Sequence, residues 1–161
     1  MIMDGLDICF MGALEVDRYG NINAHRGPGA FAGIGGFANI TAKTPTVVFC
    51  MTFDAKGLDV TQEKGVVTIR KEGEIPKFVD KVNSVSFSAK RAIENGQKVL
   101  YVTERCVFRL TPKGLKLIEV YPGVDIAGKG IFLGTKWSAS FEVEGFKFGF
   151  NLLNLEAASQ S

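Results

Sequence analysis

Residues 46–53 read TVVFCMTF, an almost unbroken apolar run that ends at the turn signal DAKG (54–57). An apolar run of this length without alternation is typical of a strand buried on both faces of a sheet. The stretches LDICFMGA (6–13) and KVLYVTE (98–104) have the same character. Three buried strands interrupted by short helices and hairpins predict an α/β fold with a mixed, largely parallel sheet and flanking helices.

Turn and cap residues divide the chain between these runs. LEVDRYGNINA (14–24) predicts a hairpin with Val16 and Ile22 on either side of its turn, and CVFRLTPKGLKLIEV (106–120) predicts a second one around TPKG. GVVTIRKEGEI (65–75) alternates apolar and polar residues, which favours a half-exposed strand. FSAKRAIENG (87–96) predicts a helix capped by Ser88 and ended by Asn-Gly.

Composition excludes several classes of function. The 161 residues suffice for one domain, and a net charge of +2 with scattered basic residues gives no reason to expect nucleic-acid binding. Charged residues interrupt every apolar run well short of a membrane span, and the acidic N-terminus is unlike a signal peptide. Three widely spaced cysteines indicate reduced thiols in a cytoplasmic protein, without a metal site.

A glycine-rich segment, GPGAFAGIGGFANI (27–40), contains Gly33, Gly35 and Ala38 at the G-x-G-x-x-A spacing of dinucleotide sites. Such a site needs a helix of about ten residues after the glycines, followed by a strand and an acidic residue. Only six residues separate Asn39 from Thr46, and Pro45 ends them, although Asp54 lies at the right distance for a ribose. A nicotinamide or flavin site is therefore not favoured.

Two interpretations of the glycines remain open. Backbone amides without nearby Cβ atoms can form a nest that holds a phosphate or the oxyanion of an acyl intermediate. Alternatively, Gly33, Gly35 and Gly36 only permit positive φ angles or close packing. His25 is the single histidine and, without a metal or triad pattern around it, is expected to be a surface or loop-bonding residue.

Longer phrases carry a resemblance to a known family. GALEVDRYGNINAHRGPGAFAGIGGFANI, VVFCMTFDAKGL, GEIPKFVDKVNSVSFSAK and VLYVTERCVFRLTPKGLKLIEVYPGVDI follow one another in order. Together they resemble the family I CoA-transferases over roughly residues 5–126. They are most similar to the C-terminal, beta-subunit-like half of the single-chain acetate, propionate and acetoacetate enzymes, and the resemblance implies the fold of half a CoA-transferase.

The resemblance implies a function and a set of site residues. The family moves coenzyme A between carboxylic acids through a glutamyl-CoA intermediate and uses no cofactor beyond the CoA thioester substrate. It implies that the loop Gly33–Phe37, with Gly35, Gly36 and Phe37, binds substrate or CoA. Asn23 would orient the nucleophile, and Gly57 would lend an amide to the oxyanion. Implied partners are an acyl-CoA, a small carboxylate and an alpha-subunit-like chain or segment in a homo- or hetero-oligomer.

The sequence departs from the family pattern at the nucleophile. The family's attacking glutamate lies in a phrase upstream of GLDICF that is absent here. Glu94 in IENG has similar neighbours but is expected to end a helix, and Glu15 is expected near the cleft without attacking. We therefore expect the chain to be inactive alone, the alternative being a non-catalytic module that binds CoA or completes the cleft of another chain.

The composition changes near residue 127. Five of the thirteen phenylalanines fall in the segment 127–161, which is also rich in glycine. We divide the chain accordingly into a CoA-transferase-like domain (1–126) and an atypical tail (127–161). A shifted reading frame or appended foreign sequence would explain the change.

Overall fold

A computed structural model describes residues 5–27, 30–31 and 36–124. Its main sheet contains five strands, which are listed here in spatial order: β1 (Ile8–Gly12), β6 (Thr46–Cys50), β12 (Lys98–Val102), β13 (Cys106–Thr111) and β14 (Gly114–Val120). β1 and β12 run parallel to β6 on its two sides, whereas β13 and β14 form an antiparallel hairpin. The mixed α/β architecture is confirmed, with two of the four pairings parallel.

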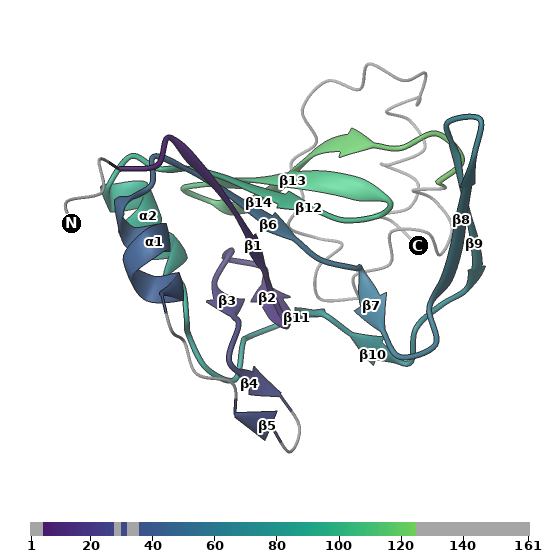
Figure 1. Cartoon of the computed structure of the whole chain (residues 1–161), viewed down its shortest axis with the longest axis horizontal. Helices are drawn as coiled ribbons and strands as arrows, with labels where there is room; N and C mark the ends of the chain where they lie inside the picture. The colour runs from purple at the N-terminus through teal and green to yellow at the C-terminus, as the bar shows by residue number, and fades with distance from the viewer. Residues whose placement is uncertain (1–4, 28–29, 32–35, 125–161) are drawn as a thin grey trace.

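Two short helices cover one face of this sheet (Figure 1). α1 (Phe37–Lys43) precedes β6, and α2 (Ala89–Glu94) precedes β12. The two helices lie side by side, and the side chain of Gln97, just after α2, donates hydrogen bonds to the carbonyl oxygens of Thr41 and Thr44 at 2.7 and 2.8 Å. α1 is only seven residues long, which confirms that the glycines do not open the long helix of a dinucleotide fold.

Aromatic rings fill the space between helices and sheet. Phe49 of β6 lies 6.2 Å from the Phe37 ring, 5.0 Å from Phe87 and 5.5 Å from Tyr101. The Tyr101 hydroxyl donates a 2.6 Å hydrogen bond to the carbonyl of Gly20. Gly20 has a φ of +92°, and a Cβ at this position would lie 2.6 Å from that hydroxyl, so the turn requires glycine.

The expectation for β1 is wrong in one respect. β1 is an edge strand, and its side chains are buried only toward the helices, where Cys9 packs in the core. Ile8 and Phe10, on the opposite face, are 45% and 67% exposed. An unbroken apolar run does not distinguish a central strand from an edge strand, because both kinds of strand can consist of apolar residues. The run at 46–53 is also shorter as a strand, since β6 ends at Cys50.

Four small sheets extend from the carboxyl ends of the parallel strands. They are β11 (Phe78–Val79) with β2 (Glu15–Asp17) and β3 (Ile22–Asn23), β4 (Arg26–Gly27) with β5 (Ala30–Phe31), β7 (Asp54–Ala55) with β10 (Ile75–Pro76), and β8 (Asp59–Glu63) with β9 (Val66–Lys71). Val16 pairs with Ile22, as the hairpin prediction requires. The strand predicted at 65–75 is shorter and is the second arm of a hairpin whose first arm, β8, is too polar to be recognised.

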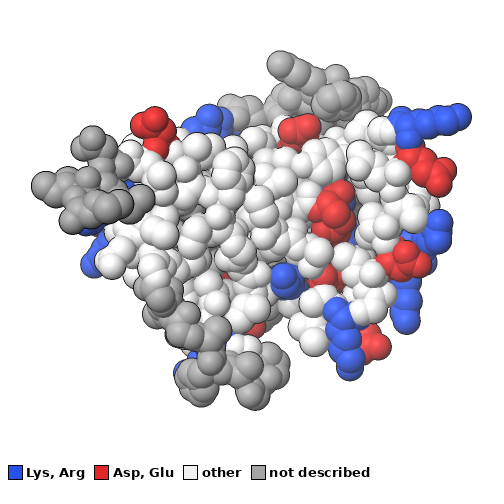
Figure 2. Space-filling model, viewed as in Figure 1, with Lys and Arg blue, Asp and Glu red and all other residues white. Residues whose placement is uncertain are grey.

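The predicted caps of α2 are present. The Ser88 hydroxyl accepts a 3.4 Å hydrogen bond from the Arg91 amide, and Gly96 has a φ of +68° just beyond the helix. Glu94 is the last helical residue and is exposed. The atypical tail predicted at 127–161 lies outside the described residues. Figure 2 shows side chains of both charge signs gathered over the end of the molecule that carries β7 to β10.

Candidate functional site

The parallel strands β1, β6 and β12 place their carboxyl ends at one edge of the sheet, where ligands bind in open α/β folds. Ala13 follows β1, Phe53 follows β6 and Glu104 follows β12. Lys77 links the ends of β1 and β6, since its Nζ donates to the Ala13 carbonyl at 3.0 Å and its amide donates to the Phe53 carbonyl at 3.4 Å. We take this edge, with the turns that follow it, as the candidate site.

Asn23 is fully buried and all its amide groups are used inside the chain. Its Nδ2 donates to Glu15 Oε2 at 3.1 Å and to the Arg26 carbonyl at 2.7 Å. Its Oδ1 accepts from the amides of His25 and Arg26 at 3.2 and 3.0 Å. An asparagine side chain has two donors and two acceptor positions. In this structure Asn23 therefore holds Glu15 and the turn that leads to β4.

Glu15 receives further hydrogen bonds from across the site. The amide and side chain of Asn83 donate to its two carboxylate oxygens at 3.4 and 3.3 Å. Glu15 is half-buried at the start of β2. The structure thus brings Glu15 and Asn23 together.

His25 lies between two serines. Its Nδ1 is hydrogen-bonded to Ser86 Oγ at 2.5 Å and its Nε2 to Ser84 Oγ at 3.1 Å. Ser86 Oγ also accepts from the Ala24 amide at 2.8 Å, so this cluster ties the β3–β4 turn to the segment 84–86. Within residues 5–27 and 36–124 both ring nitrogens are used by serines and none by a carboxylate, which agrees with a loop-bonding histidine rather than a triad.

Gly57 lies in an exposed turn directly after β7. Its φ is +88°, and the preceding Lys56 has a φ of +62°. The Lys56 carbonyl accepts from the Glu74 amide at 2.9 Å, and a salt bridge of 2.9 Å joins the two side chains. Among the described residues, the N–H of Gly57 has no acceptor. An oxyanion donor requires an exposed amide without an internal hydrogen-bond partner, as the amide of Gly57 is. Amides in ordinary surface turns have the same property.

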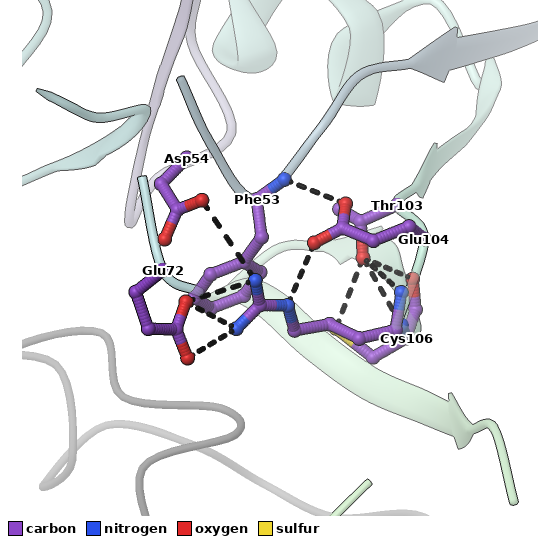
Figure 3. Close-up of polar contacts among 7 residues, drawn as sticks. Phe53, Asp54, Glu72, Thr103, Glu104 and Cys106 are labelled. Carbon is purple, nitrogen blue, oxygen red and sulfur yellow. Dashed lines mark hydrogen bonds and ion pairs between the residues drawn. The ribbon is translucent and has the colours of Figure 1, made fainter. Parts of the chain in front are cut away.

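A charge cluster surrounds the buried side chain of Arg105 (Figure 3). Arg105 is fully buried; its Nε donates to Glu104 at 2.7 Å, and its Nη1 and Nη2 each donate to Glu72 at 3.1 Å. The second oxygen of Glu104 accepts from the Phe53 amide at 2.8 Å. The guanidinium also stacks over the Phe53 ring at 4.4 Å. The cluster therefore joins the ends of β6 and β12 to the loop after β9.

Asp54 completes this cluster at longer range. Its Oδ1 is buried, lies 3.8 Å from Arg105 Nη2 and has no hydrogen-bond partner among the described residues. Burial raises the pKa of Glu72, although its hydrogen bonds from Arg105 act in the opposite direction. Burial lowers the pKa of Lys77, with Glu104 opposing the change. Asp54 thus faces the protein's own arginine rather than a ribose.

The structure separates the other predicted site residues. Gly36 caps the N-terminus of α1, and the Phe37 ring is buried against Phe49, so only the backbone of Phe37 can contact a ligand. Gly33 and Gly35 lie outside the described residues. In Figure 1, α1 and β7 stand on opposite sides of β2 and β3.

A hollow of about 290 Å³ lies between the two helices and the segment 85–88. Its lining is mostly small and polar, with one cation, and includes Ala38, Thr41, Arg91, Asn95 and Gln97. Within the described parts of the chain, no group of three His, Cys, Asp or Glu side chains is placed to hold a metal ion. Of the helices that are described, none has the length and apolar character needed to cross a bilayer.

Sequence reasoning missed Lys77 and the Arg105 cluster. The available signal was an ERC triplet directly after a buried strand, because charged residues at a strand's carboxyl end often line a site. The triplet predicts neither which residues pair with Arg105 nor that Arg105 is buried. Partners such as Glu72 and Arg105 are 33 positions apart in the sequence, so only the fold brings them together.

Comparison with known proteins gives the class. No family model matches the chain. The chain is 42% identical over 122 residues to acetate CoA-transferase YdiF of Escherichia coli K12, which covers 76% of this chain and 23% of YdiF. It is 44% identical over 127 residues to caffeate CoA-transferase of Acetobacterium woodii, with 76% and 24% coverage.

A solved structure agrees with this result. The YdiF–thioester complex with CoA from E. coli O157:H7 superposes with a TM-score of 0.75 at 41% identity and covers 78% of this chain and 24% of that one. The chain belongs, over its matched part, to the family I CoA-transferases. It spans about a quarter of the length of these relatives.

Proposed function

We propose that this chain is part of an acyl-CoA:carboxylate CoA-transferase that moves coenzyme A between short-chain carboxylic acids. The observation that carries the proposal is the 42% identity to an acetate CoA-transferase over three quarters of the chain. The superposition on a CoA thioester complex of the same relative supports acyl-CoA as the ligand.

The proposed chemistry proceeds through two covalent steps. A glutamate carboxylate attacks the acyl-CoA carbonyl, and the C–S bond breaks to give an acyl-glutamyl anhydride and CoA thiolate. The thiolate then attacks the glutamyl carbonyl of the anhydride, which releases the carboxylate and leaves a glutamyl-CoA thioester. A second carboxylate reverses these steps and leaves as the new acyl-CoA. Each attack places negative charge on a carbonyl oxygen, which backbone amides stabilise by about 3–4 kcal/mol.

Roles follow for the residues of this chain. Gly35, Gly36 and Gly57 would donate amides, and the unpartnered N–H of Gly57 supports that role for it. Asn23 would act through Glu15 and the β3–β4 turn, since its own amide is saturated. The attacking glutamate would come from an alpha-subunit-like chain or another segment.

The test has two stages. The pure chain is incubated with acetyl-CoA and labelled acetate, and we expect binding of acetyl-CoA by calorimetry without exchange of label. The second stage adds a YdiF polypeptide that lacks the quarter matched by this chain, and we then expect exchange of the label. Borohydride should trap a glutamyl-CoA thioester, and peptide mapping should locate it in the added polypeptide. Exchange by the chain alone would disprove the proposal of a missing nucleophile.

Matched glycine variants test the role of Gly57. Gly57→Ala should reduce exchange in the reconstituted enzyme by at least about tenfold, because a side chain at φ +88° shifts the turn and its amide. Gly65→Ala is the control, since Gly65 has a φ of +78° in another exposed turn. Binding of acetyl-CoA without any exchange after reconstitution would instead favour a non-catalytic CoA-binding module.

A further inference from the structure

Asp54 has a carboxylate oxygen that the described parts of the chain leave without a hydrogen bond. Its Oδ1 is buried, and Arg105 Nη2 lies 3.8 Å away, beyond hydrogen-bonding distance. A Cβ on Gly73 would lie 2.7 Å from this oxygen, so the backbone of the loop after β9 packs directly against it. A buried carboxylate that is ionised and not hydrogen-bonded is costly in free energy, which indicates a partner of another kind.

Glu72 supplies a second carboxyl group at the same end of the guanidinium. Glu72 Oε2 lies 3.1 Å from Arg105 Nη2, the atom that also faces Asp54 (Figure 3). Glu104 binds the Nε edge of the guanidinium instead. One arginine therefore faces three carboxyl groups. Glu72 and Glu104 accept hydrogen bonds from it, whereas Asp54 Oδ1 does not.

Two neighbouring carboxyl groups at one end of a cation favour the binding of a proton. Two ionised carboxylates repel each other and neither can donate a hydrogen bond, whereas a protonated carboxyl donates one to its neighbour. Burial raises the pKa of Glu72, the hydrogen bonds from Arg105 oppose this change, and a hydrogen bond with Asp54 adds to it. Lys56, the cation of the neighbouring turn, pairs with Glu74 at 2.9 Å rather than with Glu72.

We propose that Asp54 and Glu72 share one proton and form a pH-sensitive contact between β7 and the loop that follows β9. The side chain of Asp54 is 12% exposed and that of Glu72 is 44% exposed, so the proton exchanges with water through Glu72. With the proton bound, a hydrogen bond joins the two carboxyl groups beside Arg105. Once the proton has left, two negative charges face each other and Glu72 moves toward solvent.

The contact holds the turn that carries Gly57. The loop after β9 continues through Gly73 to Glu74, whose amide donates to the Lys56 carbonyl at 2.9 Å. Loss of the proton therefore loosens this turn, and the protection of the Glu74 amide from hydrogen exchange should fall as pH rises. The inference concerns groups of this chain alone and does not depend on the proposed function.

A carboxyl titration of the full chain tests the shared proton. Carbon-13 NMR follows the side-chain carboxyl of Glu72 as pH is raised, and we expect its transition above the value of 4.5 of an ordinary glutamate. The carboxyl signal of Asp54 should change in the same transition, because coupled carboxyl groups titrate as a pair. A Glu72 transition at or below 4.5, or an Asp54 signal that does not follow it, overturns the proposal.

Matched variants separate the pair from its surroundings. Asp54→Asn removes one negative charge and supplies an amide donor, so the Glu72 transition should move to lower pH. Glu74→Gln removes an exposed carboxylate two positions from Glu72 and should leave the transition in place. An unchanged Glu72 transition in Asp54→Asn, or an equal shift in both variants, overturns the proposal.

Unfolding gives a second measurement of the same proton. The folded chain holds the proton of Glu72 more tightly than the unfolded chain does, since the pKa of Glu72 is raised on folding. The contact therefore stabilises the fold fully below pH 4.5, and its contribution is lost as pH rises through the Glu72 transition. This loss should be smaller in Asp54→Asn than in Glu74→Gln or the unchanged chain, and an equal loss in all three contradicts the shared proton.

Discussion

The amide of Asn23 shows how a single side chain can organise a turn and a carboxylate. Its four hydrogen-bonding positions serve Glu15 and the two residues that lead into β4. Because Asn23 is buried, water cannot replace a lost partner. The prediction that Asn23 matters for the site is therefore compatible with the structure, but through Glu15 rather than through direct ligand contact.

Substitution at Asn23 tests this arrangement. Asn23→Ala should lower the free energy of unfolding by about 3 kcal/mol, since the half-buried carboxylate of Glu15 and two backbone amides lose their partner. Asn23→Asp keeps the acceptors but places a second carboxylate beside Glu15, and its stability should recover as pH falls and one carboxyl is protonated. Denaturant unfolding at neutral and acidic pH measures both. Asn83→Ala, at an exposed position with long hydrogen bonds, is the control and should cost less than 1 kcal/mol.

The buried thiol of Cys106 should make the free energy of unfolding depend on pH. Burial raises the pKa of its thiol from 9.0 to about 12. Below pH 9 the thiol is protonated in both the folded and the unfolded chain. As pH rises above 9, only the unfolded chain loses the proton, so the free energy of unfolding should fall, by about 1 kcal/mol at pH 10.

Cysteine variants isolate this contribution. In reducing buffer, Cys106→Ala should show a weaker decline of the unfolding free energy between pH 8 and 10 than the unchanged chain. Cys50→Ala, which removes an exposed thiol, should decline as the unchanged chain does. Equal slopes for the unchanged chain and Cys106→Ala would contradict the assignment.

At the scale of elements, Arg105 connects parts that local sequence keeps apart. It follows β12, yet it binds Glu72 in the loop between β9 and β10 and packs over Phe53 after β6. The turn that carries Gly57 belongs to the β7–β10 unit held by these contacts. We therefore expect the geometry of that turn to depend on the ion cluster around Arg105 as well as on the turn residues.

Removing the arginine should loosen that unit. Arg105→Met leaves three carboxylates without their cation and should lower the free energy of unfolding by about 3–5 kcal/mol. Hydrogen exchange of the Glu74 amide, which bonds the Lys56 carbonyl, should become faster. Arg70→Met, at an exposed position on β9, should change stability by less than about 0.5 kcal/mol. Unchanged exchange at Glu74 in a folded Arg105→Met chain would show that the cluster does not hold the turn.

At the scale of the whole molecule, the core closes at the last described residues. The Val67 amide donates to the Pro122 carbonyl at 2.8 Å, and Val124 is 3% exposed. A Cβ on Gly123 would lie 2.4 Å from the Val67 carbonyl oxygen, so the backbone at Gly123 packs closely against that of β9. The segment up to residue 124 is therefore integral to the fold.

A shortened chain tests the domain division. A chain that ends after Ile126 should unfold in one cooperative transition with most of the original free energy of unfolding, since the described core is retained. A chain that ends after Leu117 is the control and should lose cooperativity, because Val120 and Val124 leave the core. Loss of cooperativity in the longer truncation would show that residues 127–161 belong to the folding unit.

The sequence alone determined the elements whose signals are local. Apolar runs located β1, β6 and β12, and turn and cap residues located the β2–β3 and β13–β14 hairpins and α2. Colinear phrases indicated the family. These predictions succeeded because apolar pattern, caps and turn residues act within a few positions of the chain.

The tertiary structure alone decided which strand is an edge, which polar groups are satisfied and which charges meet. The sequence of β1 resembles that of a central strand, yet Ile8 and Phe10 are exposed. Asn23 acquires its role from Glu15, eight positions away, and Arg105 acquires its role from partners that include Glu72, 33 positions away, and Phe53, 52 positions away. Burial and pairing depend on packing between distant segments, and no window of neighbouring residues contains that information.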